Sequence, residues 1–193
     1  MILGITGGIG SGKSMAADIL KEEAGFAVFR TDDIARRLME EDGELKEKLR
    51  REFGSRIFDA DGRLNRKEYA AVIYSDPEKR RVSDSIVHPA VWAKTEELTG
   101  EQRKLYGDSV KAVVETALPG IEFRKISDTV WAVDADEDVR LKRLQETRGY
   151  TREYAETVIR QQPGREIYLR FADRIIRNNG TLPELKEMIL GAL

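Results

Sequence analysis

One segment near the amino terminus limits what this chain can fold into more than any other. Residues 7–14 read Gly-Gly-Ile-Gly-Ser-Gly-Lys-Ser, which fits the pattern G-x-x-x-x-G-K-[ST], and they lie between an apolar run at 2–6 and a helical pattern at 13–24. Glycines let successive backbone N–H groups converge on a phosphate, and the start of the helix adds positive potential. The lysine of such a loop reaches the β- and γ-phosphates, and the hydroxyl after it binds Mg²⁺.

The alternative is a glycine-rich turn of purely structural use. Because the strand, the lysine and the hydroxyl are all in place, the segment predicts a site for a nucleoside triphosphate, with Ser14 as the metal ligand. The residues expected to bind the nucleotide are Gly8, Ile9, Gly10, Ser11, Gly12, Lys13 and Ser14. Such a loop serves GTPases, ATPases and kinases alike, so the rest of the chain has to identify the reaction.

Five short apolar runs rich in β-branched residues predict the strands of one sheet. They lie at 2–6, 26–29, 110–114, 129–133 and 174–176. Their apolar residues are consecutive and not alternating, which indicates strands covered on both faces, as in a parallel sheet between helices. Helices are expected at 13–24, across 32–100 with one beginning at Pro77, across 136–171, and after the capping-box spacing that starts at Thr181.

The predicted fold class is therefore α/β: a P-loop three-layer sandwich with a parallel five-stranded sheet, a helical acceptor-binding lobe and a helical lid. The length of 193 residues favours one core with a small accessory lobe over two independent domains. We expect a single domain over 1–193. Its core is expected at about 1–31, 109–135 and 172–193, its helical lobe at about 32–108, and its lid at about 136–171.

Composition excludes several classes of protein. Lys plus Arg number 33 and Asp plus Glu 35, so the net charge of −2 gives no overall field that favours nucleic acid or an anionic membrane. The absence of cysteine excludes a disulfide scaffold and a thiol nucleophile, and a single histidine excludes a multi-histidine metal site. The amino terminus lacks the pattern of a signal peptide, and no apolar run approaches 18 residues, so a cytoplasmic location is expected.

A pair of carboxylates follows the second predicted strand. Asp32 and Asp33 stand at its carboxyl end, and in a parallel sheet these ends face the ligand. A carboxylate there can accept a hydroxyl proton while a phosphoryl group is transferred. The alternative is that one of them only caps a helix that begins near Ile34.

The segment from 140 to 177 is strongly basic, with ten Arg and Lys residues against five acids. Arginine can stabilise an anionic transition state, and a lid that closes over a nucleotide excludes water. Arg143 and Arg148 flank a break at Gly149, where such a lid would hinge. For most of the ten, a solvated helix face with i,i+4 ion pairs is the better interpretation.

Together these motifs resemble the dephospho-CoA kinase family, and the resemblance spans nearly the whole chain. Its most specific block is Thr-Gly-Gly-Ile-Gly-Ser-Gly-Lys-Ser at 6–14. The next is Asp32-Asp33-Ile34-Ala35-Arg36, in which Asp32 falls on the family's catalytic aspartate. Further matching segments are Phe53-Gly54, 61–66, Ile86-Val87-His88-Pro89, 141–144, Arg148, Gln162 and 172–180.

The resemblance implies phosphorylation of the ribose 3′-hydroxyl of dephospho-CoA by ATP with Mg²⁺, the last step of coenzyme A synthesis. Asp32 would then be the base, while Lys13 and Arg143 neutralise the transferring phosphoryl group. The nucleotide site would extend to Met15, Arg148 and Asn179. The acceptor site would comprise Asp32, Arg36, His88, Glu115, Ala117 and Leu118. Glu115 could also hold a metal-bound water. For both His88 and Glu115, a purely structural role is the alternative.

Three places differ from the family pattern. Met15 replaces a threonine, Arg30 replaces the first aspartate of Asp-Ala-Asp, and 115–118 replaces Pro-Leu-Leu. Two other functions therefore stay open: a small-molecule P-loop kinase for a nucleoside, a shikimate-like alcohol or a sugar acid, and a non-catalytic nucleotide sensor, against which Asp32 argues. The expected partners are ATP and dephospho-CoA, without nucleic acid or membrane. The expected state is a monomer or small homo-oligomer.

Overall fold

The computed structural model describes residues 1–193, and the chain divides into two compact units. One unit comprises Met1–Arg30 and Thr99–Leu193, and the other comprises Thr31–Leu98. The expectation of one domain with a lobe and a lid stays a prediction.

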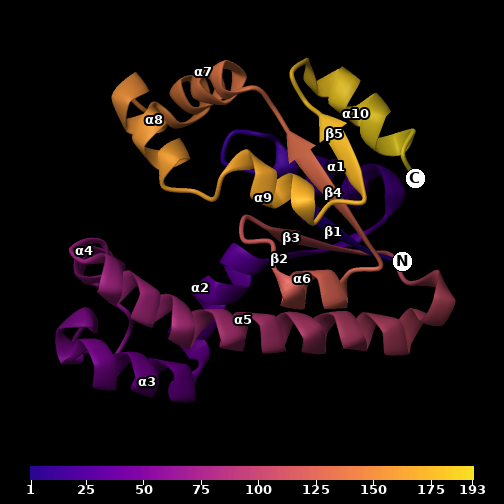
Figure 1. Ribbon diagram of the computed structural model, residues 1–193. Helices are drawn as coiled ribbons and strands as arrows, with labels where there is room; N and C mark the ends of the chain where they lie inside the picture. Colours follow the sequence, from indigo (N-terminus) through magenta and orange to yellow (C-terminus); the bar gives the residue numbers. More distant parts are fainter. The chain divides into compact units, whose positions relative to one another are not determined.

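The first unit is built on a five-stranded parallel sheet, as the sequence predicts (Figure 1). The strands are β1 (Ile2–Thr6), β2 (Ala27–Arg30), β3 (Ala112–Thr116), β4 (Thr129–Asp134) and β5 (Arg174–Arg177), in the order β2-β3-β1-β4-β5. Every residue of β1 and β3 is buried, which explains why both strands are free of polar side chains until their carboxyl ends. The register pairs Arg30 of β2 with Glu115 of β3, and Ile5 of β1 with the same Glu115. The carboxyl ends of these strands therefore meet at one edge.

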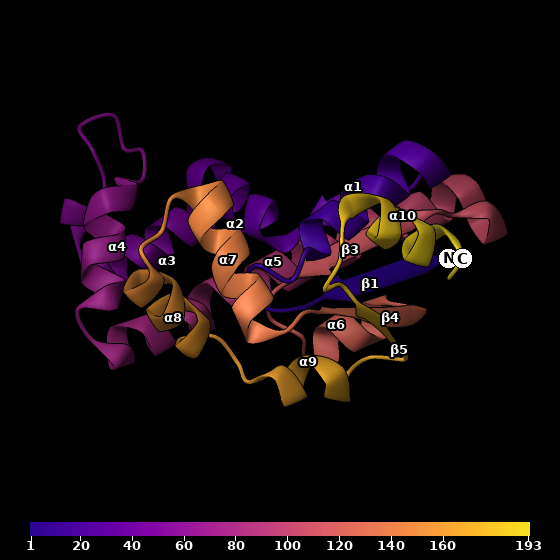
Figure 2. The same ribbon diagram turned by 90° about the horizontal axis from the view of Figure 1, so that it is seen from above.

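Helices cover both faces of this sheet. This unit contains α1 (Lys13–Ala24), α6 (Ile121–Ile126), α7 (Glu137–Arg148), α8 (Arg152–Arg160), α9 (Arg165–Arg170) and α10 (Leu182–Leu190), and the 3₁₀ turn η2 at Gly107–Ser109. In Figure 2, α1 and α10 lie on one face and α6 and α9 on the other. The core between α1, α10 and the sheet includes Leu3, Leu20, Val113 and Ile189. The three-layer prediction is confirmed.

The second unit is a cluster of helices: α2 (Thr31–Glu41), α3 (Gly43–Phe53), the 3₁₀ turn η1 (Ser55–Ile57), α4 (Arg66–Tyr74) and the part of α5 up to Leu98. Helix α5 (Pro77–Tyr106) runs through Pro89 and ends in the first unit. Asp76 precedes α5, and its carboxylate accepts a hydrogen bond from the Glu78 N–H at 2.8 Å, so the predicted start at Pro77 is confirmed. No helix combines the length and the apolar character needed to cross a membrane.

Candidate active site

The loop between β1 and α1 is shaped by glycines. Gly12 has a φ of 97° and forms the N-cap of α1, and the Ala16 N–H donates to its carbonyl at 2.9 Å. A Cβ on Gly12 would lie 2.2 Å from Asn178 Nδ2, and a Cβ on Gly7 would lie 2.3 Å from the carbonyl oxygen of Val133. Both the backbone angle and the lack of space therefore require glycine at Gly12. The loop presents the start of α1 as the sequence predicts.

Lys13 and Ser14 meet a buried carboxylate at the end of β3. The Ser14 hydroxyl donates to Glu115 Oε1 at 2.8 Å, and Lys13 Nζ lies 3.9 Å from the same oxygen. The Glu115 side chain is only 7% exposed, so its charge needs these partners. The predicted metal ligand Ser14 and the predicted substrate residue Glu115 are thus adjacent.

The other carboxylate oxygen of Glu115 accepts a hydrogen bond from Arg30. Arg30 Nε donates to Glu115 Oε2 at 3.0 Å, and Arg30 Nη2 donates to Asp18 of α1. Burial alone lowers the pKa of Arg30, but Asp18 and Glu115 outweigh that effect and the pKa is raised. Arg30 therefore stays charged and fixes how the Glu115 carboxylate is turned.

A pocket of about 360 Å³ opens beside the loop. Its lining comes from the loop, from α7 and from the segment between β5 and α10: Gly10, Gly12, Lys13, Ser14, Met15, Arg143, Leu144, Thr147, Arg148, Asn178, Gly180, Thr181, Leu182 and Leu185. Most of the predicted nucleotide residues line it, and so does Arg143. Ala117 and Leu118 lie outside it, just after β3, where Leu118 is 45% exposed.

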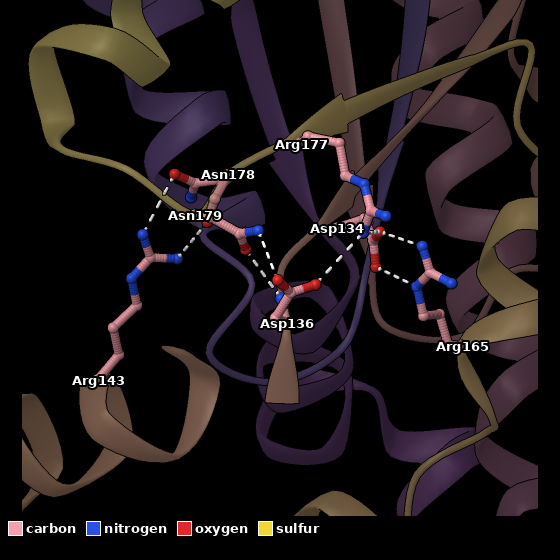
Figure 3. Close-up of polar contacts among 7 residues, drawn as sticks. All are labelled: Asp134, Asp136, Arg143, Arg165, Arg177, Asn178 and Asn179. Atoms are coloured by element: carbon pink, nitrogen blue, oxygen red, sulfur yellow. Dashed lines mark hydrogen bonds and ion pairs between the residues drawn. The ribbon is translucent and has the colours of Figure 1, made fainter. Parts of the chain in front are cut away.

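Arg143 is held by hydrogen bonds to Asn178 and Gly180, which also line this pocket, and Figure 3 shows its contacts with Asn178. Its guanidinium donates to the carbonyl of Asn178 at 2.9 Å, to Asn178 Oδ1 at 3.2 Å and to the carbonyl of Gly180 at 3.0 Å. Burial lowers the pKa of Arg143. A guanidinium held beside the phosphate loop can meet phosphate oxygens.

Asn179 does not line the pocket. Its side chain pairs with Asp136: the Asp136 N–H donates to Asn179 Oδ1 at 2.9 Å, and Asn179 Nδ2 donates to Asp136 Oδ2 at 2.8 Å (Figure 3). The neighbouring Asn178 is the residue that reaches the loop, because its Nδ2 donates to the Ser11 carbonyl at 2.7 Å. The role of Asn179 as a nucleotide residue stays a prediction.

Two residues of the segment 136–171 that the charge pattern does not single out hold the phosphate loop. Arg140 Nε donates to the carbonyl of Ile9 at 2.8 Å, and its guanidinium packs against Gly8. Gln162 accepts a hydrogen bond from the Ile9 N–H at 2.6 Å. Burial lowers the pKa of Arg140. A usable signal was present, because Arg140 precedes Arg143 by three residues and so shares its helix face.

The aspartate pair lies in the second unit. Helix α2 begins at Thr31, directly after the last residue of β2, and places Asp32 and Asp33 in its first turn. The alternative that one of them caps a helix starting near Ile34 is therefore wrong, because the helix starts before both. Asp33 lies 3.6 Å from Arg36, and both side chains are more than half exposed.

His88 lies on α5 in the second unit. Its Nε2 is 3.5 Å from Asp84 Oδ1 one turn earlier, and both side chains are partly exposed. No group of three or more His, Cys, Asp or Glu side chains gathers anywhere to hold a metal ion. Ser14 as the metal ligand, and Glu115 as a residue that could hold a metal-bound water, stay predictions.

The parallel sheet, the phosphate loop with its lysine and hydroxyl, and the arginine-lined pocket define a P-loop kinase of the kind that acts on small molecules. A family model described as Dephospho-CoA kinase matches residues 1–184. A dephospho-CoA kinase of Aromatoleum aromaticum is 36% identical over 184 residues, which cover 95% of this chain and 88% of that protein. This chain belongs to the dephospho-CoA kinase family.

Solved structures agree in fold. A Thermus thermophilus protein superposes with a TM-score of 0.77 at 30% identity, over 100% of this chain and 95% of the other. A dephospho-CoA kinase from Campylobacter jejuni gives a TM-score of 0.70 at 20% identity, over 99% of this chain and 94% of the other. As a member of its family, the chain is a kinase that uses ATP and phosphorylates dephospho-CoA in coenzyme A biosynthesis.

Proposed function

We propose that this chain transfers the γ-phosphoryl group of Mg²⁺-bound ATP to the ribose 3′-hydroxyl of dephospho-CoA. The observation that carries the donor half is the contact of Ser14 and Lys13 with the buried Glu115, beside the glycine loop. Hydroxyl and carboxylate oxygens suit Mg²⁺, which takes few protein ligands and completes its shell with phosphate oxygens and water. When bound, Mg²⁺ would neutralise charge on the phosphates.

The chain's own residues supply the remaining chemistry in this proposal. The 3′-hydroxyl oxygen bonds to the γ-phosphorus, the bond from that phosphorus to the β,γ-bridging oxygen breaks, and ADP leaves. The hydroxyl proton passes to the Asp32 carboxylate. Lys13 and Arg143 neutralise the charge on the phosphoryl oxygens.

The acceptor half of the proposal rests on chain position. Asp32 follows Arg30, the last residue of β2, by two residues along the chain, and Arg30 is in register with Glu115 at the carboxyl end of β3. Arg36 and His88 are proposed to contact dephospho-CoA. Glu115, Ala117 and Leu118 are proposed to line the dephospho-CoA site.

The cytoplasmic location and the monomeric or small homo-oligomeric state of the protein stay predictions.

The decisive experiment compares two neighbouring variants. Asp32→Asn is nearly isosteric but a poor proton acceptor, and we expect it to lower kcat by about 10²-fold or more. Asp33→Asn is the matched control and should change kcat by less than about threefold, because its side chain is exposed. ADP release is followed with dephospho-CoA, a nucleoside, shikimate and a sugar acid, and the phosphorylated position is read by NMR.

If Asp33→Asn is the inactive enzyme, the assignment is wrong by one residue. If both variants stay active, neither carboxylate is the base, and Glu115 is the next to test. Faster phosphorylation of shikimate or a sugar acid than of dephospho-CoA would overturn the proposed acceptor.

A further inference from the structure

The two oxygens of Glu115 have different partners. Oε1 accepts from the Ser14 hydroxyl at 2.8 Å and lies 3.9 Å from Lys13 Nζ, while Oε2 accepts from Arg30 Nε at 3.0 Å. Arg30 therefore turns the carboxylate so that Oε1 faces the metal-ligand position.

Arg30 also links Glu115 to Asp18 on α1. The cluster then holds two cations, Lys13 and Arg30, and two anions, Glu115 and Asp18. Its formal charge is zero. Because Glu115 is 7% exposed and Arg30 30% exposed, these charges act on one another and on a bound cation with little screening.

We propose that Arg30 is a positioning residue that sets the affinity of the Ser14–Glu115 site for the divalent cation of the nucleotide. It holds Glu115 in place for the metal and cancels part of the negative charge that attracts it. The inference rests on the proposed function, since it assumes that Mg²⁺ binds with the nucleotide at Ser14. In this proposal, the positive charge of Arg30 limits how tightly the site binds the metal ion.

Two single variants separate charge from mere structural support. Arg30→Gln and Asp18→Asn both remove the Arg30–Asp18 ion pair, but they change the cluster charge in opposite directions, to −1 and +1. A purely structural role predicts effects of the same sign. The charge role predicts effects of opposite sign, and the double variant restores a formal charge of zero.

The measurement is the ratio of the dissociation constant of ADP in EDTA to that of ADP in excess Mg²⁺, by calorimetry. This ratio isolates the contribution of the metal from that of the nucleotide. We expect Arg30→Gln to raise the ratio about fivefold or more, because the cation loses a nearby like charge. Asp18→Asn should lower it by about twofold or more, the smaller effect following from its greater exposure of 41%.

The double variant should return the ratio to within about twofold of the wild type. Arg103→Gln is the matched control and should leave the ratio unchanged. Arg103 pairs with Asp128, whose carboxylate accepts from the Ile2 N–H at the opposite, amino end of the sheet. Melting temperatures check that each variant is folded.

The outcomes are separable. If Arg30→Gln and Asp18→Asn both lower the ratio, or if neither moves it, Arg30 is structural only and the inference is overturned while the proposed reaction stands. If the wild-type ratio is one, no divalent cation binds with the nucleotide, and the metal part of the proposed function falls together with the inference.

Discussion

A buried aspartate at the end of β4 ties α9 to the sheet. Asp134 is 7% exposed and accepts hydrogen bonds from Arg165 Nε at 2.8 Å and Arg165 Nη2 at 2.7 Å, and Arg177 also donates to it (Figure 3). Arg165 is the first residue of α9 and Arg177 is the last of β5. Asp134→Asn removes the charge from this three-element junction with little change of shape.

The structure gives the size of the effect. Hydrogen bonds to charged groups contribute about 1.5–3 kcal/mol each. Asp134 accepts three such bonds, but Arg165 and Arg177 are 50% and 54% exposed, so water replaces part of what each loses. Asparagine keeps one acceptor oxygen. We therefore expect a loss of about 2–3 kcal/mol in the free energy of unfolding, or about 4–12 °C in Tm for a chain of this length.

The pH dependence of this effect has a definite sign. Burial by itself raises the pKa of Asp134, but Arg165 and Arg177 outweigh burial and the pKa is lowered below its ordinary 3.8. The stabilisation is therefore fully present above that ordinary value and is lost as pH falls through the lowered pKa of the folded state. The difference in the free energy of unfolding between wild type and Asp134→Asn should be constant from pH 7 to 5 and should shrink as the pH falls below about 4.

The assay is thermal unfolding followed by circular dichroism between pH 7 and pH 3. Glu146→Gln on α7 is the control, since its partner Lys142 lies 3.9 Å away and both side chains are more than half exposed. Its Tm should stay within about 1 °C of the wild type. The reasoning is refuted if Asp134→Asn behaves like this control, or if the gap is unchanged at pH 3.

Two further variants test the phosphate site. Arg143→Ala should lower kcat by more than it raises KM for ATP, because the guanidinium meets charge that develops in the transition state, and a change confined to KM in steady-state kinetics would contradict that role. Gly12→Ala should weaken ATP binding at least about tenfold by calorimetry, since its Cβ would lie 2.2 Å from Asn178 Nδ2. Gly25→Ala is the control, because Gly25 also has a positive φ, of 72°, but has open space around it. If both variants bind ATP with unchanged affinity, the steric argument is wrong.

The sequence predicts what local chemistry determines. The five strands, the bounds of α1 and the starts of α5 and α10 follow from apolar runs, glycines and caps, and the structure has them. The start of α2 was missed because no loop separates it from β2, so the aspartates that mark a typical helix start fall one and two residues inside the helix. Local sequence patterns predict that a helix forms, but they do not predict the residue at which the strand ends and the helix begins.

Contacts made by tertiary structure are a different matter, and Arg140 shows why. The segment 140–177 contains ten basic residues, most of which are solvent-exposed. The spacing of Arg140 and Arg143 indicates a shared helix face, but not that the Arg140 guanidinium contacts the Ile9 carbonyl. That information depends on how α7 packs over the phosphate loop, which is a property of the whole fold. The same holds for Arg30, whose two carboxylate partners come from α1 and β3.

Asn178 shows how the donor site is held as one piece. Its N–H donates to the Asp134 carbonyl at 2.7 Å, its Nδ2 donates to the Ser11 carbonyl at 2.7 Å, and its two oxygens accept from Arg143 at 2.9 and 3.2 Å. One buried side chain and its backbone therefore join the end of β4, the phosphate loop and the arginine of α7. Because a neutral amide can donate to the loop and accept from the arginine at once, it does both without placing a charge beside the phosphates. A carboxylate at this position could accept from Arg143 but could not donate to Ser11. The arginine is thus held for phosphate by a partner that does not compete for its charge.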